Sequence, residues 1–439
     1  MEYDSSKIST AIEKANRDVT ESERATEEQI NKIIKYVESL NKKRILVEDI
    51  QDIIENKLME LKKYSLAKEY IVYRYTRTLV RKQNTTDETI LGLIKNTGEV
   101  NSFSEKDEKL VTISEQRNLI AGEVSKDLTK RILLPQKIIN YIENGSMYFH
   151  NMDYFLQPMI DWSIVNIEDI LKNGTSINNV KIEAPQDFVT ACIIMADVML
   201  SVASNQYGMQ YIDLNCLGKY LANSDDTTNE KLEIGVKLLK YQINTLACIY
   251  GTKPLVTLTY SLDSVKEDYK WIKLIVDELS KCENVVLKER KDISICKAGM
   301  FNQGTVTVNL SNIAKASEKC EENFWNNLEV ALEMCYEALM CRHYGLLGTT
   351  SNVSPILWQN GAIARLGASE KIDKFLKEDF SVITLGYFGE RDVINILKDN
   401  AADDKDVQIF NERLLRYLDQ TVQKWRKMTG LGFVCKRSV

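Results

Sequence analysis

The stretch HNMDYFLQPMIDWSIVNIEDIL, residues 150–171, predicts a short strand and turn around a polar centre, Asp161-Trp162-Ser163. Short β-branched runs occur farther along the chain and are interspersed with segments of helical periodicity. The runs are PLVTLTY (254–260), GTVTVNL (304–310) and FSVITLGYF (380–388), and the helical segments are 114–143, 187–205, 231–249, 322–345 and 406–429. Because helices and strands are mixed in this way over about 320 residues, we predict an α/β barrel or a layered α/β sheet.

The first 82 residues have a different pattern, in which apolar residues recur at helical spacing. The recurring sets are Ile8, Ala11, Ile12 and Ala15; Ile30, Ile33, Ile34 and Val37; and Ile50, Ile53, Ile54 and Leu58. Together with the basic, aromatic stretch SLAKEYIVYRYTRTLVRK, they predict four helices in a small all-α domain. Residues 83–112 are polar and are predicted to form a linker or surface loops. The α/β region is expected to span residues 113–439.

Charge and cysteine usage exclude several classes of protein. The 57 basic and 63 acidic residues give a formal charge of −6, so there is no basic field for nucleic acid. Nine dispersed cysteines and no signal peptide argue against a disulfide framework and for a cytoplasmic protein. With two histidines and no Cys/His cluster, we expect no structural zinc. The longest apolar run, around 188–204, contains Asp197 and is too short to span a bilayer, so we expect no membrane protein.

The N-terminal region resembles the ATP-cone, a regulatory nucleotide-binding module, in YDSSKISTAIEKA, VEDIQDIIENKLM and AKEYIVYRYTR. The resemblance implies that ATP, dATP or another nucleotide effector contacts Lys7, Tyr73 and Arg74. It also implies a β-hairpin lid before the helices, and we expect most of that lid to be absent, because Met1 almost coincides with the Tyr-Asp that follows it. Alternatively, Lys7 and Arg74 are solvated helix charges.

The larger region resembles the anaerobic, glycyl-radical (class III) ribonucleoside-triphosphate reductases. The similar blocks keep the family's order and include QRNLIAGEVSKDLTKRILLPQKI, YFHNMDYFLQPM, SVASNQYGMQ, YQINTLACIYGTKPLVTL, TVTVNLSNIA, SVITLGYFGE and VQKWRKMTGLGF. The resemblance implies a ten-stranded glycyl-radical-enzyme-type α/β barrel, complete or incomplete, preceded by the ATP-cone-like domain. It also implies a dimer that acts on ribonucleotides, with a radical-SAM activase among its partners.

Reduction by this family requires a relay from a glycyl radical to a thiyl radical, and a second thiol that works with formate. The resemblance places the second thiol in an Asn-Cys-Cys segment directly after QPM, where this chain has Asp161-Trp162-Ser163 and has no cysteine between Met147 and Cys192. A hydroxyl or an indole cannot replace a thiol in hydrogen-atom exchange, and an indole also fills space that small side chains leave for substrate. We expect this substitution to oppose activity.

The thiyl position corresponds to Cys296 in ISICKAGMFNQGTVTVNL, but Lys297 and Ala298 replace the arginine and serine of the family's context. Alternatively, Cys296 is a small buried hydrophobic residue at the end of a strand. Asn309 corresponds to a substrate-contacting asparagine of the family. An asparagine that closes a strand can equally bond its own backbone.

Other nucleotide-binding positions implied by the resemblance are His150, Ser204, Asn205, Gln206, Gly208 and Gln210. His150 can equally be a buried histidine with its hydrogen bonds satisfied. The family's glycyl-radical loop and four-cysteine zinc site lie in its C-terminal region. Because this chain stops at Val439, before both, we expect neither a glycyl radical nor a metal in it.

Two functional hypotheses follow. The first is a reductase-like homologue that cannot reduce ribonucleotides alone and acts by binding nucleoside triphosphates, a full-length reductase or a second copy of itself. The alternative is the catalytic-barrel half of a split reductase, which forms deoxyribonucleotides with a separate chain that carries the glycyl radical.

Overall fold

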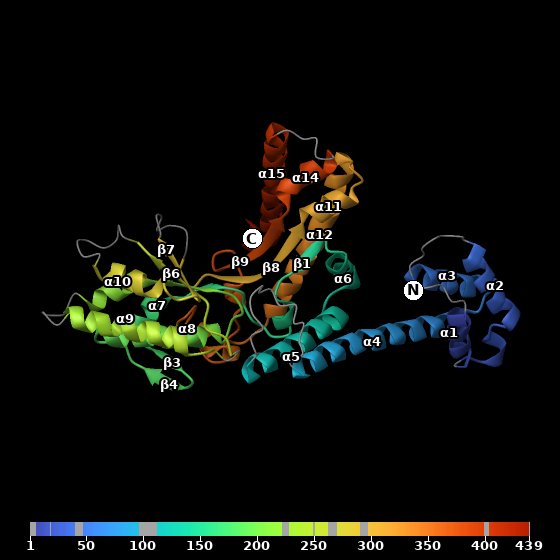
Figure 1. Ribbon diagram of the computed structural model, residues 1–439. Helices are drawn as coiled ribbons and strands as arrows, with labels where there is room; N and C mark the ends of the chain where they lie inside the picture. The colour runs from blue at the N-terminus through green and yellow to red at the C-terminus, as the bar shows by residue number, and fades with distance from the viewer. Residues whose placement is uncertain are drawn as a thin grey trace. The chain divides into compact units, whose positions relative to one another are not determined.

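The computed structural model describes residues 6–17, 19–39, 47–95, 112–221, 228–248, 251–261, 270–289, 297–398 and 404–438. The chain divides into two compact units, residues 1–99 and 100–439, and each is described by itself. Figure 1 shows an all-helical N-terminal unit and a second unit that mixes helices with strands. The predicted mixed α/β class with a helical N-terminal region is therefore confirmed.

The N-terminal unit contains α1 (Ser6–Arg17), the short helix η1 (Glu21–Glu23), α2 (Glu27–Ser39), α3 (Val47–Glu60) and α4 (Tyr64–Lys95). Its core consists of the residues that recur at helical spacing, and Ile12, Ile54 and Leu58 are almost completely buried. Helix α4 continues to Lys95, so the first part of the predicted loop segment 83–112 is helical instead. The segment is polar, but it contains no proline that would end a helix.

The second unit begins with α5 (Ile113–Leu128), the π-helical turn η2 (Thr129–Leu133) and α6 (Gln136–Glu143). Helical elements that follow are η3 (Met152–Tyr154), α7 (Ile167–Asn173), α8 (Phe188–Ala203), η4 (Leu214–Tyr220), α9 (Thr228–Thr245), α10 (Lys270–Leu279), α11 (Leu310–Ala316), α12 (Glu321–Leu346), η5 (Ser351–Val353), α13 (Pro355–Trp358), η6 (Asp373–Phe375), α14 (Glu390–Leu397) and α15 (Asp404–Thr429). None of the helices described is both long and apolar enough to cross a membrane.

The described strands of this unit form one sheet of eight and a separate hairpin of two. The sheet contains β1 (Met147–Phe149), β2 (Ser163–Ile164), β5 (Gln210–Asp213), β6 (Val256–Tyr260), β7 (Val285–Glu289), β8 (Phe301–Asn309), β9 (Ser381–Phe388) and β10 (Phe433–Arg437), and the hairpin contains β3 (Thr175–Ile177) and β4 (Val180–Ile182). The order along the sheet is β10-β9-β8-β2-β5-β6-β7, and β1 pairs with β8.

Strand direction divides this sheet into two halves. Strands β8, β9 and β10 are parallel to one another, as are β2, β5, β6 and β7. The halves meet where β2 runs antiparallel to β8, with Ser163 paired to Phe301. We call this junction the seam. The polar centre Asp161-Trp162-Ser163 lies at the seam, so the segment that organised the sequence analysis also joins the two halves.

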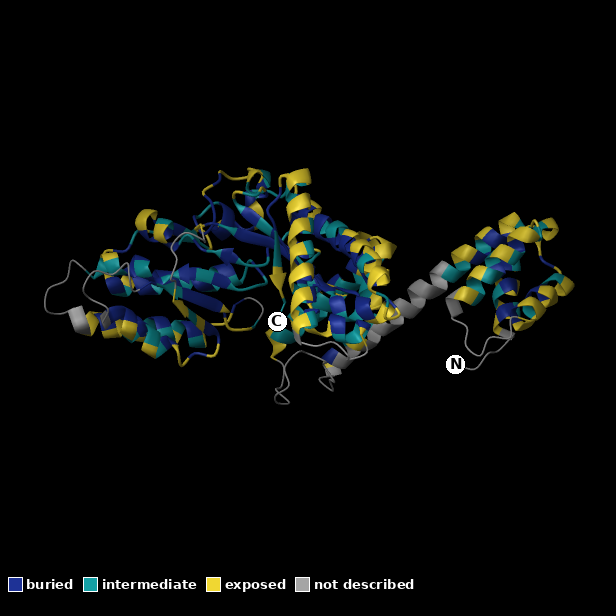
Figure 2. Cartoon of the chain, turned by 90° about the horizontal axis from the view of Figure 1, so that it is seen from above, coloured by how far each residue is buried: buried dark blue, intermediate teal, exposed yellow. Residues whose placement is uncertain are grey.

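Each half has its own apolar core. Helix α8 supplies much of the core beside β5 and β6, which explains why its sequence is apolar nearly all round. Helices α12 and α15 supply the core beside β8, β9 and β10. Figure 2 shows the buried residues gathered inside this unit, with exposed residues along the outer faces of its helices. The two cores thus pack the strands of the two halves that meet at the seam.

Candidate functional site

A cluster of buried and partly buried polar side chains lies at the seam. One carboxylate oxygen of Asp161 accepts hydrogen bonds from Asn302 Nδ2 at 2.8 Å and from Thr305 Oγ1 at 3.0 Å. The Asp161 backbone N–H also donates to the Asn302 carbonyl at 2.9 Å, and Thr384 Oγ1 donates to Asn302 Oδ1 at 3.1 Å. Asn302 and Thr305 flank an irregularity in the pairing of β8 with β9. Three segments far apart in sequence are thereby joined around one carboxyl group.

Burial raises the pKa of the Asp161 carboxyl, because a charge is poorly solvated at this depth. The hydrogen bonds from Thr305 and Asn302 and the positive charges of Arg342 and Lys436 oppose this effect. The pKa of Asp161 nevertheless stays above its ordinary value, so this carboxyl takes up a proton more readily than a solvated aspartate does.

The guanidinium of Arg342, on α12, is enclosed by aromatic rings. Its central carbon lies 4.3 Å from the ring centre of Phe149, 5.2 Å from that of Phe155 and 5.6 Å from that of Tyr207. Arg342 is only 3% exposed, and Nη1 donates to the Tyr207 hydroxyl at 3.3 Å. Nε and Nη2 have no hydrogen-bond partner within the described part of the chain. Contact with the ring faces therefore replaces much of the lost hydration of this cation.

His150 begins a short chain of hydrogen bonds beside this arginine. Its Nε2 lies 2.7 Å from Thr307 Oγ1, which lies 2.8 Å from Ser438 Oγ. Burial, and secondarily the charge of Arg342, lower the pKa of His150 to about 4. The imidazole is therefore neutral at physiological pH and can accept or donate a hydrogen bond, depending on its tautomer.

Acid is expected to destabilise the chain partly through His150. In the unfolded chain this histidine takes up a proton near pH 6.5, whereas in the folded chain it does so only near pH 4. Its contribution to stability is thus complete above pH 6.5 and is lost as the pH falls toward 4, by up to about 3 kcal/mol. The free energy of unfolding, measured by chemical denaturation at several pH values between 7.5 and 4, tests this prediction. The variant His150→Gln should lose less stability over that interval, and an equal loss in both proteins would contradict the assignment.

Trp162 and Ser163 are also engaged by their neighbours. The indole of Trp162 packs edge-on against Tyr211 with ring centres 5.7 Å apart, and Lys436 Nζ lies 5.4 Å from its ring centre. Ser163 is completely buried and donates from Oγ to Gln206 Oε1 at 2.6 Å. Each residue that stands where the family resemblance implies Asn-Cys-Cys therefore has its own set of contacts.

The segment 204–210 is hydrogen-bonded to the chain at the seam, through Gln206 to Ser163 and through Gly208 N–H to the Asp161 carbonyl. Gln206 donates from Nε2 to the carbonyls of Gly208 at 3.2 Å and Met209 at 3.1 Å. A Cβ on Gly208 would lie 2.3 Å from Asp161 Oδ1 and 2.6 Å from the Asp161 carbonyl oxygen, so a glycine is needed there. The remaining predicted residues also bond backbone carbonyls: Ser204 Oγ donates to Leu200 at 3.0 Å, Asn205 Nδ2 to Ser201 at 2.8 Å, and Gln210 Nε2 to Met199 at 2.7 Å.

Asn309 lies at the end of β8 and caps α11. Its side chain accepts a hydrogen bond from the Asn312 backbone N–H at 3.1 Å and donates to the Gly145 carbonyl at 2.9 Å. A role in substrate contact stays a prediction. Cys296 lies outside the described residues, and its role stays a prediction as well. Across the described residues, no group of three or more His, Cys, Asp and Glu side chains is arranged to hold a metal ion.

The three predicted effector residues lie in the N-terminal unit. Lys7 is exposed on α1, and Tyr73 is partly buried on α4, where Lys14 Nζ lies 5.9 Å from its ring centre. Arg74 Nη1 forms ion pairs with Asp52 at 2.6 Å and Glu55 at 2.8 Å, both on α3. The arginine thus links two helices, and a phosphate would have to compete with two carboxylates for it.

Sequence reasoning did not single out Asn302, Thr305, Thr307 or Arg342 as site residues. Asn302 and the two threonines lie in or beside a β-branched run, where they resemble ordinary strand residues. Arg342 could have been noticed, because it is the one lysine or arginine in residues 321–346, a segment that forms the partly buried helix α12. A lone cation in a buried helix requires a special environment.

The sequence matches two described families. The family "Anaerobic ribonucleoside-triphosphate reductase" matches residues 105–283 and 277–438, and "ATP cone domain" matches residues 1–79. The anaerobic ribonucleoside-triphosphate reductase of Haemophilus influenzae is 27% identical over 98% of this chain and 74% of its own length. The Escherichia coli protein of the same name is 26% identical over 88% of this chain and 68% of its own.

Solved structures give the same fold. The crystal structure of the anaerobic ribonucleotide reductase from Thermotoga maritima with dATP bound in the specificity site is similar with a TM-score of 0.56 at 13% identity. The similarity covers 81% of this chain and 76% of that chain.

Proposed function

This chain belongs to the anaerobic ribonucleoside-triphosphate reductase family, and on that premise we propose that it is a binding homologue that does not reduce ribonucleotides by itself. In this proposal the chain binds nucleoside triphosphates through its ATP-cone domain and its α/β unit, and it acts on a full-length reductase or on a second copy of itself. The residues at the seam carry the proposal.

The main support comes from the side chains and hydrogen bonds of Asp161, Trp162 and Ser163. The chemistry implied by the family resemblance requires a thiol in this segment, and this chain has an acid, an indole and a hydroxyl there. Asp161 is bonded to Asn302 and Thr305, and Ser163 is bonded to Gln206. Of these side chains, Asp161 is bonded across the junction between the two halves of the sheet, whereas the Ser163 bond stays within one half. None of them can exchange a hydrogen atom with a ribose carbon as a thiol does.

Nucleotide binding is proposed for the N-terminal unit, with Lys7, Tyr73 and Arg74 as contacts. The ATP-cone match supports an effector site there. Arg74 would pass from Asp52 and Glu55 to a phosphate, which is feasible because an arginine binds phosphate oxygens in the same forked geometry as carboxylates.

Calorimetric titration of the full chain with ATP and dATP tests the binding half of this proposal. We expect saturable heat from at least one of the two nucleotides, and affinity reduced at least about tenfold in Lys7→Met, since a hydrogen bond to a charged group contributes roughly 1.5–3 kcal/mol. Lys35→Met, which removes an exposed lysine from α2, is the matched control and should bind as the unaltered chain does. No heat from either nucleotide would contradict effector binding.

The split-enzyme alternative makes a different demand. It requires that deoxyribonucleotide form when a separate chain supplies the glycyl radical, together with formate and the radical-SAM activase. Asp161, Trp162 and Ser163 oppose it, because a division of the gene gives no reason to replace a reacting thiol. Product in that mixture would favour the split enzyme over the binding homologue.

A further inference from the structure

A cavity lies between α14 and α15, two helices that pack on the half of the sheet containing β8, β9 and β10. Its volume is about 620 Å³, which is within the usual range for a ligand site. The lining consists of Arg391 and Asn395 on α14, and of Val407, Gln408, Asn411, Glu412 and Leu415 on α15. An ion pair of 2.5 Å between Lys398 and Asp406 joins the end of α14 to the first turn of α15. The two walls of the cavity are therefore held together at that end.

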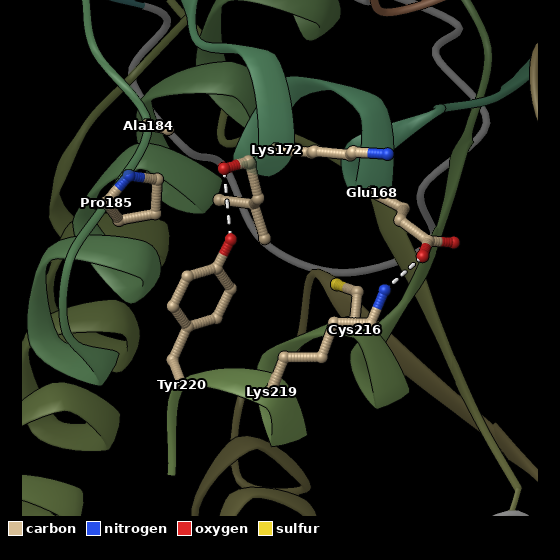
Figure 3. A pocket seen from close by; sticks show the side chains of 8 residues that line it. Glu168, Lys172, Ala184, Pro185, Cys216, Lys219 and Tyr220 are labelled. Atoms are coloured by element: carbon tan, nitrogen blue, oxygen red, sulfur yellow. Dashed lines mark hydrogen bonds and ion pairs between the residues drawn. The ribbon is translucent and has the colours of Figure 1, made fainter. Parts of the chain in front are cut away.

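Two polar groups of this cavity are unpaired. Asn411 Oδ1 is buried and accepts no hydrogen bond within the described part of the chain. Arg391, on the facing helix, is exposed and forms no ion pair with the residues that the structure describes. The cavity in Figure 3 differs, because Tyr220 there donates to a backbone carbonyl at 3.0 Å and Lys219 pairs with Glu168. A buried acceptor without a donor is destabilising, so a ligand that donates a hydrogen bond to Asn411 would be favoured.

Asn411 stands between two apolar side chains on α15. Val407, Asn411 and Leu415 follow one another at intervals of four residues, so they form one row along the helix. Each apolar residue lies about 6 Å from the asparagine along the helix axis. In an extended peptide, residues two positions apart carry side chains on the same face about 7 Å apart. Two such side chains can straddle Asn411 and contact Val407 and Leu415.

The charged groups of the cavity favour a ligand with one carboxylate. Arg391 presents a forked guanidinium, which binds the two oxygens of a carboxylate together. Glu412, which accepts a hydrogen bond from Gln408 Nε2 at 3.2 Å, would repel a second carboxylate. The cavity therefore suits a ligand with apolar side chains better than one with acidic side chains.

We propose that this cavity binds the free carboxyl end of a short peptide with apolar side chains. The terminal carboxylate pairs with Arg391, and a peptide N–H donates to Asn411 Oδ1. The apolar side chains lie against Val407 and Leu415. The inference goes beyond the function proposed above and does not depend on it, because the cavity includes no residue of the seam or of the N-terminal unit.

The tripeptide N-acetyl-leucyl-glycyl-leucine is a suitable probe, since it carries one free carboxylate and two apolar side chains. Calorimetric titration of the full chain should show saturable binding of this acid, and binding at least about tenfold weaker for its carboxyl-terminal amide. Arg391→Met should weaken the acid at least about tenfold and remove the preference for the acid over the amide. Arg416→Met removes an exposed arginine of α15 that does not line the cavity, and this control should bind as the unaltered chain does.

A second variant tests the buried amide. Asn411→Leu should weaken the tripeptide about fivefold, which is the usual effect of losing one neutral hydrogen bond. It should not lower the midpoint of thermal unfolding, because the amide oxygen has no partner to lose within the described residues. Free leucine lacks the peptide unit and should not displace the tripeptide. Absence of saturable binding, equal affinity for the acid and the amide, or displacement by an equal concentration of free leucine would overturn the proposal.

Discussion

Replacing Gly208 with alanine is expected to lower the free energy of unfolding by about 3 kcal/mol, a large effect for the addition of one methyl group. The new Cβ would lie 2.3 Å from Asp161 Oδ1 and 2.6 Å from the Asp161 carbonyl oxygen. The second neighbour is backbone at the seam, and that backbone also accepts a hydrogen bond from Gly208 N–H at 2.7 Å. Neither group can retreat without breaking the junction between the two halves.

Equilibrium denaturation measures this loss, and Gly345→Ala provides the matched control. Gly345 lies in α12, is exposed, and would bring its Cβ no closer than 3.7 Å to Phe155. The same substitution there should be neutral or stabilising by up to about 1 kcal/mol, since alanine favours the helix more than glycine does. If the two variants were equally stable, the seam would not be as closely packed as described.

Truncating Arg342 to alanine is expected to cost about 3–5 kcal/mol, because the change leaves a cavity among three aromatic rings. Arg342→Met should cost much less, about 1–2 kcal/mol. Methionine fills most of the space, makes favourable contacts with aromatic rings, and removes a buried charge whose hydrogen bonds are incomplete. A larger loss of stability in Arg342→Ala than in Arg342→Met would show that lost packing costs more than the lost charge.

The same two variants should affect His150. The charge of Arg342 helps to lower the pKa of His150, so the pKa should rise when that charge is removed. NMR titration of the imidazole in Arg342→Met measures this, with the unaltered chain as reference. An unchanged His150 pKa, or equal destabilisation by alanine and methionine, would contradict the described environment of Arg342.

The elements of the fold were largely predictable because they depend on local patterns. Apolar residues at helical spacing predicted the N-terminal helices, and β-branched runs predicted β6, β8 and β9. The extension of α4 to Lys95 was not predicted, because polar composition was taken as a sign of a loop. A polar segment without proline can continue a helix that has already been nucleated.

The site was less predictable, because its contacts join residues far apart in sequence. Asp161 meets Asn302 across 141 positions and Thr305 across 144. Nothing local to Asp161 indicates that its carboxyl will be buried and bonded. Sequence reasoning identified the segment through a family resemblance and through what is missing from it. The structure adds what the substituted residues do there.

The central proposal is that the seam of this chain does not support ribonucleotide reduction, because residues 161–163 contain no thiol. Anaerobic incubation of the purified chain with a ribonucleoside triphosphate, formate and the radical-SAM activase tests it most directly, with deoxynucleotide measured by chromatography and the glycyl radical by EPR. An authentic reductase of the family run in parallel shows that the mixture is competent. We expect no deoxynucleotide from this chain. Deoxynucleotide formed by this chain alone would contradict the account.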